Sequence, residues 1–233
     1  ERCKVSFIFT QRVLKYANQF KTKVHILHVS TRNEMEILKN KKKFITVEVT
    51  PQHLTLSSPD CYDQLGTLSQ MNPPIRGISH QSGLWEGIKN GTVNVIGSDH
   101  APHTLKEKDR EWPSSPSGMP GVQTLLPIML NHVNNGKLDL KTLVKLTSVN
   151  AAKIYKIKNK GELKIGYDAD ITIIDLNKKV ILKNKNMASK SKWTPFDNLQ
   201  VKGYPFATIV NGKLKMLNGK LIGKPDGKVV KFE

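Results

Sequence analysis

Short apolar runs that alternate with helix-like segments constrain this sequence more than any other feature. They extend from residue 7 to about residue 155, and such alternation is typical of βαβ units on a parallel sheet. We expect strands in KVHILHVS at 23–30, in FITVEVT at 44–50 and in TVNVIGSD at 92–99. The second strand should end at Pro51, because proline cannot donate a ladder hydrogen bond.

Helical periodicity fills the intervals between these runs. Apolar residues between Phe9 and Ala17 share one face of a predicted helix at 7–20. The Ser30-Thr31 pair is placed to cap a second helix at 32–40. Further helices are predicted at 82–90, 121–134 and 140–155. The first part of the chain therefore contains three strand-loop-helix units and belongs to the α/β fold class.

A second, β-rich module follows. From GELKIGYDADITIIDL onward the hydrophobic period becomes two, with glycine and asparagine turns between short strands. We expect antiparallel strands in ITIIDL, KVILKN, ATIVNGKLKM and GKLIG, with a hairpin turn at Asn211-Gly212. The interval 184–205 is expected to be a loop-rich connection. These patterns predict two domains, at 1–160 and 161–233.

Composition excludes several classes of protein. A chain of 233 residues with 38% hydrophobic residues can bury a real core. It has no apolar run near the roughly 18 residues of a membrane span and no secretory pattern at its start, so we expect a soluble, cytoplasmic protein without a membrane partner. Cys3 and Cys61 fit no CxxC spacing, and we expect both to be reduced thiols.

The formal net charge of +18 raises the question of nucleic-acid binding. The lysines, however, are spread over the whole chain, for example in 39–43, 156–164 and 178–186, and they accompany many asparagines. Arginines and aromatic side chains, which recognise phosphates and stack on bases, are few. The pattern favours a lysine-rich solvated surface over a nucleic-acid site, with an acidic protein partner as the other alternative.

Polar residues lie where the predicted strands end. In parallel α/β folds the reactive groups collect at the carboxyl ends of the strands, and His28 and Asp99 occupy such ends, with Asn72 in the loop after the second strand. Imidazole and carboxylate groups are suitable zinc ligands. Each residue alone has a structural alternative, since His28 could be a hydrogen-bonded core residue and Asp99 a helix cap. We assign His25 to a structural role, and His80 and His132 to the surface or to packing.

Five motifs occur in a fixed order: HILHVST, VEVTPQHLTL, QMNPPIR, GSDHAPHT and PSGMPGVQTLLPIML. Together they resemble the cyclic amidohydrolases, and among these the class I dihydroorotases, which are related to hydantoinases and allantoinases. The tail segments KGELKIGYDADITIIDL, SKWTPFD and TIVNGK also resemble that family, so the resemblance covers nearly the whole chain. It implies a partial (β/α)₈ TIM-type barrel, comprising the last three strand-helix units, followed by a small β-sandwich.

The resemblance also implies roles for individual residues. His28 matches a zinc ligand, and Asp99 matches a ligand that is also the catalytic general base and acid. The residues that match substrate-binding positions are Asn72, His103, Pro120 and Gly121. His53 and His100 belong to the signature but are not expected to be metal ligands, and Gln52 stands where many relatives have a second histidine.

The family motif HxH is not present in this sequence. In the family, this motif and the metal ligands of the fourth and fifth barrel strands would lie upstream of residue 1. The chain would then keep only two metal ligands, whereas catalytic zinc sites use about three. We therefore expect weak Zn²⁺ binding and a truncated protein that is inactive alone. The alternatives are completion by an upstream complementing chain and a noncatalytic scaffold that docks a transcarbamoylase. Association into a homo-oligomer is left open in each case.

The substrate implied by the resemblance is a small cyclic amide. The combination of NPPIR with SDHAPHT favours the interconversion of dihydroorotate and carbamoyl aspartate in pyrimidine biosynthesis. Hydantoin and allantoin share the cyclic amide bond and stay as alternatives.

Overall fold

The computed structural model describes residues 2–233, with side chains from Cys3 onward. The chain forms two compact units. Unit 1 extends to Leu125 and takes up a later segment, Lys183–Asn198, whereas unit 2 comprises Leu126–Leu182 and Leu199–Glu233. The predicted boundary at residue 160 separates a barrel domain from a β-rich domain, which is a different division from these two compact units, and it stays a prediction.

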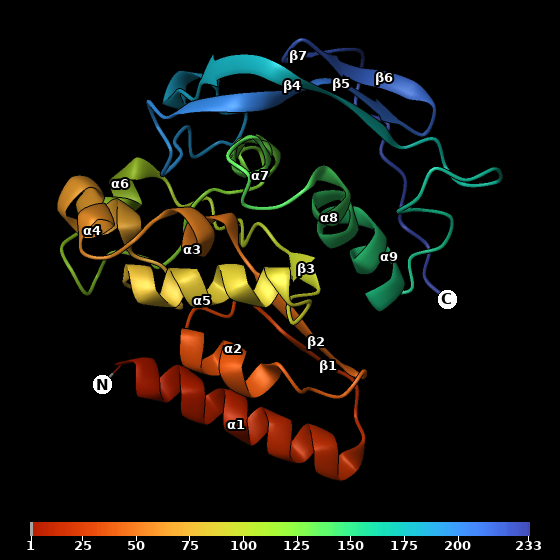
Figure 1. The fold of residues 1–233 in the computed structure, drawn as a ribbon. Helices are drawn as coiled ribbons and strands as arrows, with labels where there is room; N and C mark the ends of the chain where they lie inside the picture. Colours follow the sequence, from red (N-terminus) through yellow and green to blue (C-terminus); the bar gives the residue numbers. More distant parts are fainter. Residues whose placement is uncertain (1) are drawn as a thin grey trace. The chain divides into compact units, whose positions relative to one another are not determined.

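Unit 1 is built on a three-stranded parallel sheet. Its strands are β1 (Val24–Ile26), β2 (Ile45–Val49) and β3 (Val95–Ile96), in the order β1-β2-β3 (Figure 1). Val24 pairs with Ile45, and Glu48 pairs with Val95. The three strands lie within the apolar runs that the sequence predicted, and their parallel order confirms the α/β class.

The burial of β2 explains its sequence pattern. Ile45, Val47 and Val49 are buried, while Thr46 and Glu48 between them are only partly buried, as alternation along a strand requires. On this second face, the His25 ring contacts the Thr46 hydroxyl through Nδ1 at 2.7 Å and approaches Glu48 Oε2 through Nε2 at 3.7 Å. The predicted structural role of His25 is consistent with these contacts.

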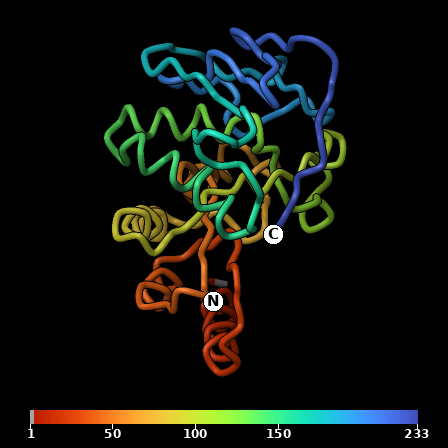
Figure 2. Tube along the Cα trace, turned by 90° about the vertical axis from the view of Figure 1, so that its right-hand side faces the viewer, coloured from red at the N-terminus to blue at the C-terminus, as the bar shows by residue number. Residues whose placement is uncertain are grey.

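Three helices accompany the sheet: α1 (Arg2–Phe20), α2 (Arg32–Leu38) and α5 (Ile78–Lys89). Figures 1 and 2 show α1 beside α2, and α2 packs on α5. A Cβ atom on Gly87 would lie 2.7 Å from Met35 Sδ, so glycine permits the close approach of α2 and α5. The first helix is longer than predicted, because it begins at residue 2 rather than at residue 7.

The capping prediction for α2 is confirmed. The Thr31 hydroxyl accepts a hydrogen bond from Glu34 N at 3.2 Å, and Glu34 Oε2 accepts one from Thr31 N at 3.2 Å. This reciprocal pair is a capping box. Glu34 Oε1 also accepts from the Thr10 hydroxyl at 2.8 Å, which ties α1 to α2.

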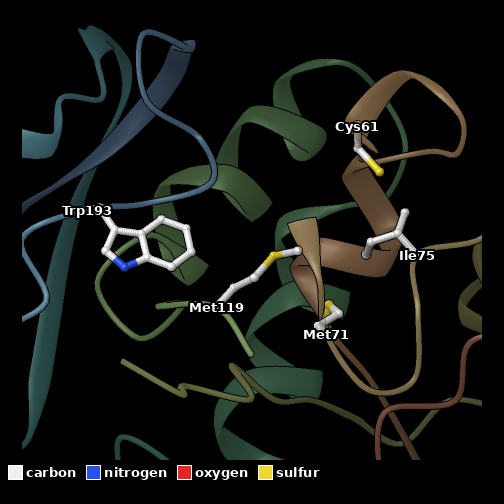
Figure 3. Close-up of a cluster of buried hydrophobic side chains, with 5 residues drawn as sticks. All are labelled: Cys61, Met71, Ile75, Met119 and Trp193. Atoms are coloured by element: carbon white, nitrogen blue, oxygen red, sulfur yellow. The ribbon is translucent and has the colours of Figure 1, made fainter. Parts of the chain in front are cut away.

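Short helices and loops connect β2 to β3 and follow β3. They are α3 (Pro51–Thr55), α4 (Asp60–Leu65), a 3₁₀ turn at Gly66–Ser69, and α6 (Leu105–Lys108). Their apolar side chains form the buried cluster of Figure 3, which comprises Cys61, Met71, Ile75, Met119 and Trp193. Trp193 comes from the later segment of unit 1. Part of the predicted 184–205 connection is therefore core structure, and residues 200–205 are already strand.

Unit 2 contains α7 (Leu125–Asn134) apart from its first residue, α8 (Leu140–Val144), a π-helical turn at Lys145–Val149 and α9 (Asn150–Ile154). One antiparallel sheet follows, of β4 (Ile171–Ile181), β5 (Gln200–Val210), β6 (Lys213–Leu217) and β7 (Lys220–Leu221), in that order. Two predicted strands merge into β4, and the predicted hairpin turn at Asn211-Gly212 joins β5 to β6.

Within residues 2–233 there is no helix with the length and apolar character needed to cross a lipid bilayer.

Candidate functional site

Residues after the three parallel strands lie at one edge of the unit 1 sheet. His28 follows β1 by two residues, and Asp99 follows β3 by three. Parallel strands place their carboxyl ends together, so the loops that carry these residues leave the same edge. The two residues that the sequence singled out as metal ligands are thus brought to a common edge of the sheet.

Both strand ends have a left-handed backbone. The φ angle is 37° at His28 and 42° at Asp99, although neither residue is glycine. Backbone hydrogen bonds to β2 hold the residues beside these positions: Val29 N donates to Glu48 O at 2.9 Å, and Gly97 N donates to Val49 O at 3.0 Å. Non-glycine residues in this region of φ are uncommon and cluster at functional sites.

Electrostatic coupling joins the two residues. Burial raises the pKa of the Asp99 carboxyl above its ordinary value, the charge of His28 opposes that rise, and the Glu48 carboxylate adds to it. Glu48 lies under the strand end, because a Cβ atom on Gly97 would sit 2.4 Å from its carboxylate. His28, Asp99 and Glu48 therefore share one electrostatic environment.

His28 Nδ1 is buried without a hydrogen-bond partner in residues 2–233. A buried polar atom without a partner is costly, so this nitrogen points to a ligand such as a metal ion or a water molecule. Across the part of the chain that the structure describes, however, no three histidine, cysteine, aspartate or glutamate side chains gather to hold a metal. His28 and Asp99 alone do not fit the three-ligand zinc site that the resemblance implies.

His53 lies in the first turn of α3 and is neutral and fully bonded. Nδ1 accepts from the Thr50 hydroxyl at 2.8 Å, and Nε2 donates to Pro73 O at 2.9 Å. Burial lowers the pKa of His53 to about 4. Nε2 thus holds the loop that contains Asn72, whose own side chain is exposed, while Nδ1 holds the cap of α3.

His103 and His100 organise the loop after Asp99. His103 Nε2 donates to Ser117 O at 3.2 Å, and its backbone carbonyl accepts from Trp193 Nε1 at 2.7 Å. His100 Nδ1 accepts from Gly121 N at 3.1 Å. The two imidazoles therefore connect the Asp99 loop to the segment that carries Pro120 and Gly121.

Gly121 lies against the strand end that leads to Asp99. A Cβ atom at this position would be 2.3 Å from Ser98 O and 2.7 Å from Gln52 Nε2, so a larger residue would displace the loop. Its N–H is bonded to His100, and its carbonyl accepts from Thr124 N and Leu125 N. Gly121 contributes close approach here, while both of its backbone polar groups are already used within the chain.

A cavity of about 240 Å³ opens beside this segment. Its wall is lined by His100, Pro120, Gly121, Val122, Gln123, Thr124, Met187, Ala188, Ser189 and Trp193. The Gln123 amide fixes the far wall by donating to Asn186 O at 2.9 Å and accepting from Ala188 N at 2.8 Å. Of the predicted site residues, the cavity includes Pro120 and Gly121, and it does not include His28 or Asp99.

Three residues around the site were missed by sequence reasoning. Glu48 alternates with buried apolar residues on β2, and this alternation could have predicted that its side chain lies on the other face of the sheet, near the site. Trp193 lies within SKWTPFD, a motif that contributed to the resemblance without a role of its own. Nothing in the sequence distinguishes Lys108, because a single lysine in a lysine-rich chain is expected to be exposed.

Residues 10–215 match the amidohydrolase family. The dihydroorotase of Pyrococcus abyssi is 40% identical over 218 residues, which are 93% of this chain and 52% of the relative. That of Methanosphaera stadtmanae is 37% identical over 209 residues, 89% of this chain and 48% of the relative. The chain thus spans about half the length of the curated relatives it matches.

The chain also matches about half the length of similar proteins of known structure. An L-hydantoinase (dihydropyrimidinase) from Arthrobacter aurescens superposes with a TM-score of 0.87 at 30% identity, covering 92% of this chain and 49% of that one. A dihydropyrimidinase from Brevibacillus agri has a TM-score of 0.86 at 25% identity, with coverage of 92% and 49%.

Proposed function

The chain belongs to the amidohydrolase family, and from that premise we propose that it forms part of the active site of a dihydroorotase-type cyclic amidohydrolase. The observation that carries the proposal is the electrostatic coupling of His28 and Asp99, whose loops leave one sheet edge, with the buried imidazole Nδ1 of His28 left without a partner in the described residues. The sequence similarity to dihydroorotases indicates the substrate, dihydroorotate or carbamoyl aspartate.

In this proposal Asp99 moves the proton. A water molecule attacks the ring amide carbon while the Asp99 carboxylate accepts a proton from it. Asp99 then returns that proton to the ring nitrogen as the C–N bond breaks, which gives the open-chain product. The raised pKa of Asp99 favours the second step, because a carboxyl that is easier to protonate holds the proton until the ring nitrogen takes it.

His28 and Asp99 would be two ligands of a divalent metal, as Zn²⁺ dependence in the family leads us to expect. The described residues do not complete such a site, so the proposal requires at least one further donor from outside them. Asn72, His103, Pro120 and Gly121 would then contact the cyclic amide.

The fold assignment that accompanies this function is also a proposal. The strands β1, β2 and β3 would be the last three of a (β/α)₈ barrel, and residues 161–233 would belong to a small β-sandwich. The superpositions on the L-hydantoinase and the dihydropyrimidinase, which cover about half of each longer chain, support this assignment.

The test is complementation. The chain is purified alone and also after co-expression with the part of a dihydroorotase that it does not match, and dihydroorotate hydrolysis and zinc content are measured. We expect neither activity nor tight zinc in the chain alone, and both in the complemented protein. Asp99→Asn should lower the rate by about 10²–10⁴-fold, whereas Asp109→Asn, an exposed aspartate in the same region, should not.

Two results would contradict the proposal: activity that survives Asp99→Asn, or no hydrolysis of dihydroorotate, hydantoin or allantoin in any preparation. The second result would favour the noncatalytic scaffold, which the incomplete donor set already makes the second candidate. A scaffold would capture a transcarbamoylase in a pull-down without any gain of hydrolysis.

A further inference from the structure

Lys108 is fully buried at the end of α6, with 0% of its surface exposed. Buried lysines are rare, because the charged group loses its hydration unless the protein supplies partners. Lys108 Nζ donates to two backbone carbonyls, Gln70 O and Pro116 O, each at 2.8 Å. None of the roles proposed above uses this side chain.

The two carbonyls belong to different loops of the proposed site. Gln70 precedes Asn72 by two residues, and Pro116 precedes Pro120 by four. One ammonium group therefore bridges the loop that presents Asn72 and the loop that presents Pro120 and Gly121.

Further bonds close a network around the ammonium group. Gln70 Nε2 donates to Ser115 O at 2.8 Å, and Gly118 N donates to Gln70 O at 2.9 Å. The Ser115 hydroxyl donates to the Lys108 carbonyl at 3.0 Å. Gln70 O thus accepts from both Gly118 and Lys108, and both loops depend on the same few atoms.

The second loop is also joined to the residues after Asp99. Ala101 N donates to Met119 O at 3.0 Å, and His103 Nε2 donates to Ser117 O. On its other side, Met119 packs in the buried cluster with Met71 and Trp193 (Figure 3). Residues 115–121 are therefore held between the Asn72 loop and the Asp99 loop.

We propose that Lys108 is a positioning residue of this site, whose ammonium group holds the Asn72 loop and the Pro120-Gly121 loop at a fixed separation. The part of this inference that concerns substrate rests on the proposed function. A preset separation would hold the cyclic amide in one orientation and would spare the cost of ordering two loops on binding. Burial lowers the pKa of Lys108 to about 8, so the group is still mostly charged at neutral pH.

Lys108→Met tests the bridge, because it keeps a long apolar chain and removes the donors. The matched control is Lys106→Met, an exposed lysine on the same helix. Amide hydrogen exchange should become at least about tenfold faster in residues 115–121 of Lys108→Met, with Gly118 N as the most direct reporter, and the β2 amides should keep their rates. Lys106→Met should match the wild type.

Lys108→Arg keeps a cationic donor and should recover part of the lost protection, which separates the lost donors from lost packing. Lys108→Gln, which keeps a neutral NH₂ donor, is the second variant if Lys108→Met does not fold. In the complemented enzyme, Lys108→Met should raise KM about tenfold or more and leave the shape of the pH profile unchanged.

Unchanged exchange at Gly118 would overturn the bridge, and faster exchange with an unchanged KM would overturn the positioning role. Absence of hydrolysis in every preparation would instead refute the proposed function, and the exchange rates would still decide whether Lys108 holds the two loops.

Discussion

The two units of the chain differ in what they bury. All fourteen polar or charged side chains that are buried within residues 2–233 lie in unit 1, from Thr10 to Thr194. The buried side chains of unit 2 are all apolar, as at Met129, Leu143 and Val201. Its aspartates face solvent, and Asp226 pairs there with Lys213 and Lys215.

This difference shows which unit buries polar groups at a cost in desolvation free energy. A buried polar group destabilises a protein unless it is fully hydrogen-bonded, and unit 1 bonds Glu34, His53 and Lys108 to neighbouring loops or helices. Each of these bonds fixes one backbone segment relative to another. The unit that contains every predicted site residue is therefore the one that uses buried polar groups to position its loops.

The largest expected effect comes from removing the residue that closes the unit 1 core. Trp193→Ala deletes a side chain that is 0% exposed and leaves His103 O without its donor. We expect a loss of roughly 4 kcal/mol in the free energy of unfolding, measured by urea denaturation followed by circular dichroism. Trp193→Phe should lose less, since it keeps an aromatic ring. A loss below about 1 kcal/mol in Trp193→Ala would mean that this segment is not part of the core.

Acid should act on unit 1 through His53. Its folded pKa of about 4 lies below the ordinary value of 6.5, so the unfolded chain binds the proton first. The contribution of His53 to the free energy of unfolding is therefore fully present above pH 6.5. It is lost as the pH falls toward 4, by roughly 3 kcal/mol in total. Urea denaturation at a series of pH values should show a shallower loss in His53→Gln than in the wild type.

His132 in unit 2 provides the matched comparison for that experiment. Burial also lowers its pKa to about 4, with the charge of Lys137 adding to the effect. His132→Gln should likewise reduce the acid dependence. Only His53→Gln should also speed amide exchange near Pro73, because His53 Nε2 donates to that carbonyl. Equal exchange in the two variants would remove the distinction between the units.

The smallest of these effects is expected at a backbone position in unit 2. Gly203 has a φ of 98°, and a Cβ atom there would lie 2.7 Å from Leu130 Cβ. Gly203→Ala should cost about 2 kcal/mol through strain and displacement of α7, as measured by thermal unfolding. Gly219→Ala is the control, since it has a similar φ of 79° and nothing within 4 Å. An equal loss in both variants would assign the cost to φ alone.

Local patterns in the sequence predicted much of this fold. Alternation located β2, the Ser30-Thr31 pair located the start of α2, and Asn211-Gly212 located the turn between β5 and β6. These features depend on neighbouring residues, so a single sequence contains them. The positions of His28 and Asp99 followed from the rule for parallel strand ends, although their roles stay predictions.

The remaining features depend on contacts between distant residues. Lys108 is buried because Gln70 and Pro116, 38 and 8 residues away, supply acceptors. The segment around Trp193 joins unit 1 through a bond to His103, 90 residues earlier. Neither hydrophobic periodicity nor turn chemistry reports such pairings, and the lysine-rich composition concealed the buried Lys108.

Unit 1 is discontinuous, and this has a consequence for synthesis on the ribosome. Translation delivers unit 1 up to Leu125 before the segment with Trp193, which follows only after Leu126–Leu182 of unit 2 have emerged. Until then the other members of the buried cluster, among them Met71 and Met119, lack Trp193 and stay available to chaperones. A pause before residue 193 would prolong this exposure, and a premature stop there would release a chain whose first unit lacks its later segment.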